Sequence, residues 1–169
     1  EFRRVLFRSV DRVISDFLNG TCEWLVEQAE TLGDWIFVEG QGSIDHPAYS
    51  AVTLGLIHGS TPDAMVLVHK PGLAAHDFEH RPEFTFPLMD LPRSIAAHEL
   101  IAGMVKPAPV VAVALNTSLH PDEADARRLI AETAALTGLP TDDPFRFGGG
   151  PLFAAIRERV EAIDRKSTR

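Results

Sequence analysis

The residues best suited to chemistry lie in one short segment, Glu39-Gly-Gln-Gly-Ser43, followed by His46. A carboxylate directly after an apolar run and before two glycines could hold Mg²⁺, act as a general base, or simply cap a turn. Gly40 and Gly42 would let backbone amides approach a ligand closely. His46 could serve as an acid, a base or a hydrogen-bond donor, or it could substitute for a helix N-cap. We therefore take Glu39 and His46 as candidate catalytic residues.

A second set of candidates could bind a ligand rather than react with it. Lys70 ends an apolar strand and could pair with a phosphate or carboxylate, or remain a solvated lysine. Asn116 ends another apolar strand and offers amide groups able to read a nucleobase edge, although Asn is also a common turn former. The full set of ligand-binding candidates around these residues comprises Gly40, Gln41, Gly42, Ser43, Tyr49, Ser50, His69 and Lys70, with Asn116 and Thr117 beside them.

Alternating helices and strands must position these groups. Short apolar runs predict buried strands at Trp35–Val38, 64–70 and 109–116, with a very short fourth strand or extended loop near 140–150. Helical spacing predicts helices over residues 11–31, from His46-Pro47 to about His58, and over 92–105, 121–138 and 152–164. The segment 71–87 is predicted to be irregular. This order is typical of an α/β fold with a parallel sheet, in which ligands bind beyond the carboxyl ends of the strands.

Composition excludes several classes of protein. The chain has 169 residues, 45% hydrophobic residues and a net charge of −8. Residues 1–9 and 165–169 resemble translated adapter sequence, and we interpret them as artefactual tails; the remaining 10–164 carry a net charge of −13. Such acidity disfavours nucleic acid as a partner, and no apolar stretch is long enough for a membrane span. The single cysteine, Cys22, fits a cytoplasmic protein.

Three segments together resemble a known family. They are DWIFVEGQGSIDHPAYSAVTLGLIHGSTPDAMVLVHKPG, VVAVALNTSLHPDEA and LPTDDPFRFGGGPL. They are similar to the C-terminal P-loop domain of a family long labelled as a domain of unknown function, which includes DgcN-type D-glutamate N-acetyltransferases. The resemblance covers residues 10–164, and VEGQGS with HPAYS is its most specific part. It implies a three-layer P-loop fold with a mostly parallel sheet, similar to dethiobiotin synthetase.

The resemblance also implies roles for residues. In the dethiobiotin synthetase branch, a Glu after a strand binds metal, and an Asn together with a Pro-containing loop contacts adenine. By position, Glu39 would take the first role, and the cofactor-binding residues would be Asn116, Thr117, Pro140, Phe147 and Gly148. The implied activity is transfer of an acetyl group from acetyl-CoA to D-glutamate or a similar acidic amino acid. Glu39 or His46 would then be the base, and backbone amides of Gly40 to Ser43 would stabilise the oxyanion.

Two other functions remain open at this point. The first is an ATP- or GTP-dependent ligase or kinase that uses Mg-ATP, with Glu39 on the metal and Asn116 on the base. The second is a nucleotide-binding protein without catalysis. All three hypotheses involve a small-molecule ligand, and association of the chain with copies of itself is compatible with each.

One departure from the family pattern bears on all three hypotheses. The chain contains no Gly-x-x-x-x-Gly-Lys-Ser/Thr motif, the backbone cradle that holds phosphates in P-loop proteins. We therefore expect a fragment truncated at its N-terminal side, without the first strand of the sheet, the phosphate cradle and a preceding N-terminal domain. We expect such a fragment to be inactive alone and to expose apolar surface where the first strand would pack.

Overall fold

The computed structural model describes residues 17–76 and 85–167. The chain divides into two compact units. The first unit comprises Glu1–Pro62 with Ile101–Lys106, and the second comprises Asp63–Leu100 with Pro107–Arg169. In the described ranges, no helix is both long and apolar enough to cross a bilayer.

The first unit is built on two packed helices, α2 (Leu18–Glu30) and α3 (Ser50–Ser60). The buried face of α2 has the predicted helical spacing and consists of Leu18, Cys22, Leu25 and Ala29. The Cys22 thiol donates a hydrogen bond to the carbonyl of Leu56, and burial raises the pKa of this thiol. Residues 11–16 of the predicted first helix lie outside the described residues.

Two glycines on α3 permit the close approach of the helices. A Cβ atom on Gly55 would lie 2.5 Å from Cδ2 of Leu18, and one on Gly59 would lie 2.3 Å from the carbonyl oxygen of Asn19. Because both distances are far inside van der Waals contact, any larger residue would push α2 away from α3. The two small residues, four positions apart, therefore set the spacing of this helix pair.

The prediction of a buried strand at Trp35–Val38 is wrong. This run is extended but pairs with none of the strands in the described part of the chain. Its side chains are 37–70% exposed, and the rings of Trp35 and Phe37 lie on the same side of the chain with centroids 6.2 Å apart. Apolar composition favours burial, but a strand also needs neighbours for its backbone N–H and C=O groups. That second requirement is not encoded in the run itself.

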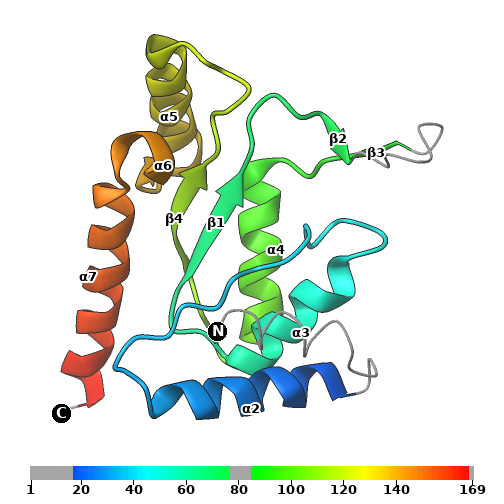
Figure 1. Cartoon of the computed structure of the whole chain (residues 1–169), viewed down its shortest axis with the longest axis vertical. Coiled ribbons are helices and arrows are strands. Elements are labelled where there is room, and N and C mark those ends of the chain that lie inside the picture. The colour runs from blue at the N-terminus through cyan, green and yellow to red at the C-terminus, as the bar shows by residue number, and fades with distance from the viewer. Residues whose placement is uncertain (1–16, 77–84, 168–169) are drawn as a thin grey trace. The chain divides into compact units, whose positions relative to one another are not determined.

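The second unit contains a parallel sheet, as predicted. Its strands are β1 (Met65–His69), β4 (Val110–Leu115) and β5 (Thr141–Asp142), in the order β1-β4-β5 (Figure 1). The central strand, β4, is buried along nearly its whole length. Each strand end faces the same edge because all three run in one direction.

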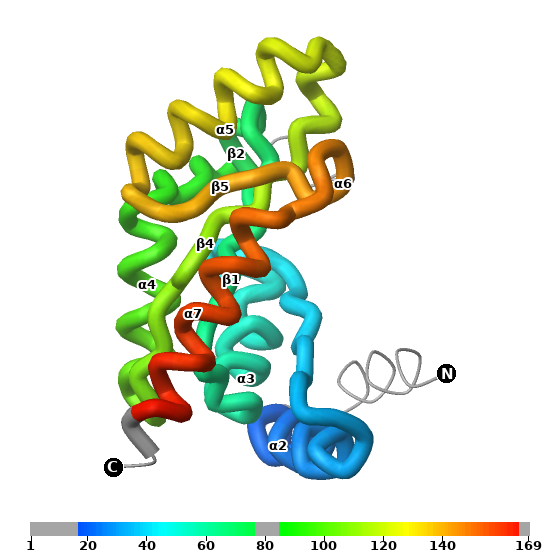
Figure 2. Tube along the Cα trace, turned by 90° about the vertical axis from the view of Figure 1, so that its left-hand side faces the viewer, coloured from blue at the N-terminus to red at the C-terminus, as the bar shows by residue number. Residues whose placement is uncertain are grey.

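Helices cover this sheet on both sides. Helices α5 (Glu123–Thr137) and α7 (Gly150–Ser167) contact β4 and β5, and α7 runs along β4 in Figure 2. Helix α4 (Leu91–Gly103) lies across the β1–β4 pair from α7 (Figure 1). From α4, the Glu99 carboxylate accepts a hydrogen bond from the backbone N–H of Val110 at 2.9 Å. The α/β class with a mostly parallel sheet is thus confirmed.

Other segments of the second unit also depart from the sequence prediction. Helix α7 ends at Ser167 rather than at 164, and it thereby includes Arg165, which pairs with Glu161 at 3.8 Å. The region 71–87, predicted to be irregular, contains an antiparallel pair of two-residue strands, β2 (Ala75–His76) and β3 (Phe86–Pro87). The predicted short segment after β5 includes a four-residue helix, α6 (Pro144–Phe147).

Candidate functional site

The predicted site residues form two groups, one in each unit. The first unit holds the Glu39–Ser50 group, and the second holds the ends of β1, β4 and β5 with the loops that follow them. Each group is organised by its own contacts.

In the first unit, Gly42 anchors the segment before α3. A Cβ atom at Gly42 would lie 2.6 Å from Cβ of Tyr49, so only glycine fits at this position. The carbonyl of Gly42 also accepts a hydrogen bond from the hydroxyl of Thr53 on α3. The sequence analysis expected a ligand to approach the backbone closely at Gly42. In the structure, the side chain of Tyr49 makes such an approach.

His46 is buried in a turn, where one of its ring nitrogens accepts a backbone N–H. Helix α3 begins at Ser50, not at the predicted His46-Pro47, because residues 47–49 form turns before it. Nδ1 of His46 accepts the backbone N–H of Ala48 at 3.1 Å, and the imidazole stacks on Tyr49 at a centroid distance of 4.4 Å. An imidazole that accepts at Nδ1 carries its proton at Nε2 when neutral. His46 thus stabilises the turn before α3, whereas the N-cap position of that helix is occupied by Tyr49.

The other candidates in this group are more open. Glu39 is exposed, and a Cβ atom at Gly40 would meet nothing within 4 Å. Gln41 is exposed, and the Ser43 hydroxyl donates to the Asp45 carboxylate. The backbone N–H of Ser50 bonds the carbonyl of His46 at 3.0 Å. The free backbone around Gly40 is therefore the part of this segment that a ligand could approach.

In the second unit, the ends of β1 and β4 lie side by side. The backbone N–H of Asn116 donates to the carbonyl of His69 at 2.8 Å, which places Lys70 and Asn116 at the same edge of the sheet. Burial lowers the pKa of His69 below its ordinary value. The side-chain oxygen of Asn116 accepts the N–H of Ser118 at 3.1 Å, so the amide stabilises a turn, one of its two predicted roles.

Thr117 is fully buried and is held by Asp143. Both the N–H and the hydroxyl of Thr117 donate to Oδ2 of Asp143, at 3.0 and 2.6 Å. The other carboxylate oxygen, Oδ1, accepts the N–H groups of Phe145 and Arg146 at 3.0 and 3.1 Å and so caps α6. Burial by itself raises the pKa of Asp143, but these four hydrogen bonds outweigh it and hold the pKa below its ordinary value.

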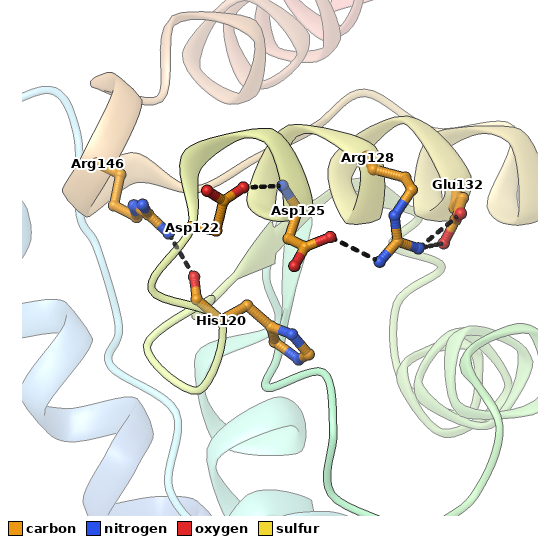
Figure 3. A network of polar contacts seen from close by, with 6 residues as sticks. All are labelled: His120, Asp122, Asp125, Arg128, Glu132 and Arg146. Carbon is orange, nitrogen blue, oxygen red and sulfur yellow. Dashed lines mark hydrogen bonds and ion pairs between the residues drawn. The ribbon is translucent and has the colours of Figure 1, made fainter.

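Arg146 extends this cluster to the loop that precedes α5. Its guanidinium donates to the carbonyls of His120 and Pro121 at 2.8 and 2.9 Å and to the Thr117 hydroxyl at 3.2 Å. Figure 3 shows Arg146 and His120 next to the start of α5, where Asp122 accepts the N–H of Asp125. The arginine thus joins α6 to the loop after β4.

The remaining predicted residues surround α6. Phe147 packs under the guanidinium of Arg127, 4.1 Å from ring centroid to Cζ, and lines an open depression of about 390 Å³. Gly148 has φ +88° and ends α6, a conformation that favours glycine. The carbonyl of Pro140 accepts the N–H of Val113 within the sheet. Phe145, which was not predicted, is 98% exposed.

Sequence reasoning missed Asp143, Arg146 and His120. A signal for Asp143 was present, because Asp directly before Pro144 is typical of an N-cap followed by a proline in the first turn of a helix. No local signal identified Arg146 or His120, whose contacts span 26 residues. In the parts of the chain that the structure describes, no cluster of three or more His, Cys, Asp or Glu side chains forms a metal site.

Comparison with known proteins assigns this arrangement to a family. Residues 7–153 match the model described as "Domain of unknown function (DUF1611_C) P-loop domain". The chain belongs to this family. This membership confirms the predicted P-loop fold.

Relatives within and around this family carry further names. Two proteins named D-glutamate N-acetyltransferase, from Tritonibacter scottomollicae and from a Pseudoalteromonas species, are 35% and 36% identical over 147 and 150 residues. These alignments cover 87% and 88% of the chain. A crystal structure of a DUF1611 family protein from Anabaena variabilis matches 88% of the chain with a TM-score of 0.78 and 41% identity. The chain spans 43% of the length of each of these three proteins.

Proposed function

We propose that this chain is part of an N-acetyltransferase that transfers an acetyl group from acetyl-CoA to the amine of D-glutamate or a similar acidic amino acid. The observation that carries the proposal is the name shared by two relatives that align with nearly nine-tenths of the chain. Because the chain spans less than half of those relatives, we propose further that activity requires the rest of the protein.

The chemistry requires a base and a site for the oxyanion. The ammonium group of the amino acid loses a proton, the amine attacks the thioester carbonyl, and the tetrahedral oxyanion collapses to release coenzyme A as its thiol. Of the two predicted bases, Glu39 is an exposed carboxylate, whereas Nδ1 of His46 already accepts a backbone N–H. We therefore assign the base to Glu39 and a structural role in the preceding turn to His46.

The oxyanion donors in this proposal are backbone amides near Gly40. The open space around Gly40 supports this assignment, since a substrate carbonyl can approach the backbone there. Within the second unit alone, we propose Asn116, Phe147 and Gly148 as the residues that bind an adenine nucleotide, the group that acetyl-CoA carries, with Lys70 binding a phosphate. Thr117 is fully buried and contributes through Asp143 rather than by direct contact.

The test uses the full-length protein with acetyl-CoA and D-glutamate, and it measures thiol release. We expect Glu39→Gln to lower kcat by about 100-fold or more, the usual contribution of a general base. As a control, Glu27→Gln makes the same change at an exposed carboxylate on α2 and should leave kcat unchanged. Activity should survive chelation of Mg²⁺. Strict dependence on Mg-ATP would instead favour a ligase or kinase with Glu39 on the metal, and ligand binding without turnover would favour a non-catalytic nucleotide-binding protein.

A further inference from the structure

The loops that follow β4 and β5 are joined by one buried carboxylate. Asp143 is 2% exposed and uses both oxygens, one on Thr117 and one on the first turn of α6. Thr117 is the second residue after β4, and Asp143 follows β5 directly. A single side chain thus fixes the separation of two strand ends that are 26 residues apart in sequence.

The same cluster reaches the loop after β1. Arg146 donates to the carbonyl of His120, and Nε2 of His120 lies against the backbone of Gly72, where a Cβ atom would be only 3.1 Å away. Gly72 has φ +93° and follows the His69-Lys70 end of β1. Asp143, Arg146 and the His120 ring together therefore connect the loops after all three described parallel strands.

We propose that Asp143 is a positioning residue that, with Arg146, holds these loops in the one arrangement that binds an adenine nucleotide. The proposal rests on the proposed function for the identity of the ligand, because acetyl-CoA carries this group. Asp143 itself does not touch the ligand. Asn116, next to Thr117, and Phe147, at the end of α6, are the groups that it positions.

A comparison of two N-caps provides a matched control. Asp122 caps α5 through one oxygen, which accepts the N–H of Asp125, whereas Asp143 needs both of its oxygens. An Asn side chain has one acceptor oxygen and one donor NH₂ group. Asp122→Asn therefore keeps its single cap bond, because Asn caps helices as well as Asp does. Asp143→Asn places a donor against either Thr117 or the first turn of α6.

The experiment measures two quantities in the unmodified full-length protein and in both variants: amide hydrogen exchange, and affinity for coenzyme A and separately for ATP. In Asp143→Asn we expect exchange at Thr117 and Phe145 to accelerate by about tenfold or more, since hydrogen bonds to a charged group are lost. Exchange within β4 should stay unchanged. Affinity should fall by about tenfold for whichever probe binds, and Asp122→Asn should change neither quantity.

The outcomes separate this inference from the proposed function. Binding of ATP but not coenzyme A, with the expected loss in Asp143→Asn, would contradict the acetyl-CoA proposal and support the positioning role. Normal affinity in Asp143→Asn would overturn the positioning role and leave the acetyltransferase proposal standing. Faster exchange throughout β4 would mean that Asp143 only stabilises the fold, which also overturns the inference. If neither probe binds the unmodified protein, both proposals fail.

Discussion

Two entirely apolar runs of this protein have opposite environments. Val110–Leu115 forms β4, the centre of a parallel sheet, and Val113 within it is fully buried. Trp35–Val38 is extended and exposed, with Phe37 at 70% exposure. Hydrophobicity is therefore not what separates them. β4 has a hydrogen-bonded neighbour on each side and helices over it, whereas the run at 35–38 pairs with no strand of the described residues.

Truncating one side chain in each run tests this difference directly and should produce the largest effect. Val113→Ala removes two methyl groups from a closed core and should lower the free energy of unfolding by about 2 kcal/mol. Phe37→Ala removes a mostly solvated ring and should cost less than about 0.5 kcal/mol. Urea unfolding measures both values. An equal loss in the two variants would contradict the contrast, because it would mean that Phe37 is buried in solution.

The glycines that follow the exposed run sharpen the comparison. Gly42→Ala forces a methyl group onto Tyr49 and should destabilise the first unit by about 1–2 kcal/mol. Gly40→Ala, two residues earlier, meets open space and should be neutral within about 0.5 kcal/mol. Thermal unfolding of the two variants gives the comparison. A neutral Gly42→Ala would show that the order seen at Tyr49 does not persist in solution.

The smallest effect concerns His69, which lies in the β1–β4 ladder. Burial lowers its pKa in the folded protein, so the unfolded chain binds a proton more readily. The folded state should therefore lose stability as the pH falls through the unfolded value of about 6.5, and it should be unaffected above it. His69→Gln should remove this part of the pH dependence. Titration of the ring by NMR should give a pKa below that of a histidine peptide, and an ordinary value would contradict the burial.

The elements with a strong local pattern were predicted well from the sequence. The apolar spacing from Leu18 to Ala29 identified α2, and the acidic start at Asp122 identified α5, in which Asp122 is the N-cap. The β4 run was identified because its length and composition suit a buried strand. In each of these cases, the information lies within one segment of the chain.

Features that depend on distant partners were missed or mistaken. The pairing of Thr117 with Asp143 joins positions 26 residues apart, and no local pattern encodes it. The exposure of Trp35–Val38 depends on which strands are available to pair with it. The site prediction was similarly local. It named Gly42 as a place where a ligand could approach and left two roles open for His46, but no local pattern shows that Tyr49 packs against Gly42 or that Nδ1 of His46 accepts the N–H of Ala48.

Because Cys22 is buried, a dye can be directed to a cysteine introduced elsewhere in the chain. It is the only cysteine of the chain, it is 1% exposed, and burial raises the pKa of its thiol, so we expect it to react slowly with alkylating dyes. A cysteine introduced at Phe145, which is 98% exposed, would then be the single accessible thiol. A fluorophore attached there would test whether a ligand binds at the ends of β4 and β5, without any need to remove the native sulfur.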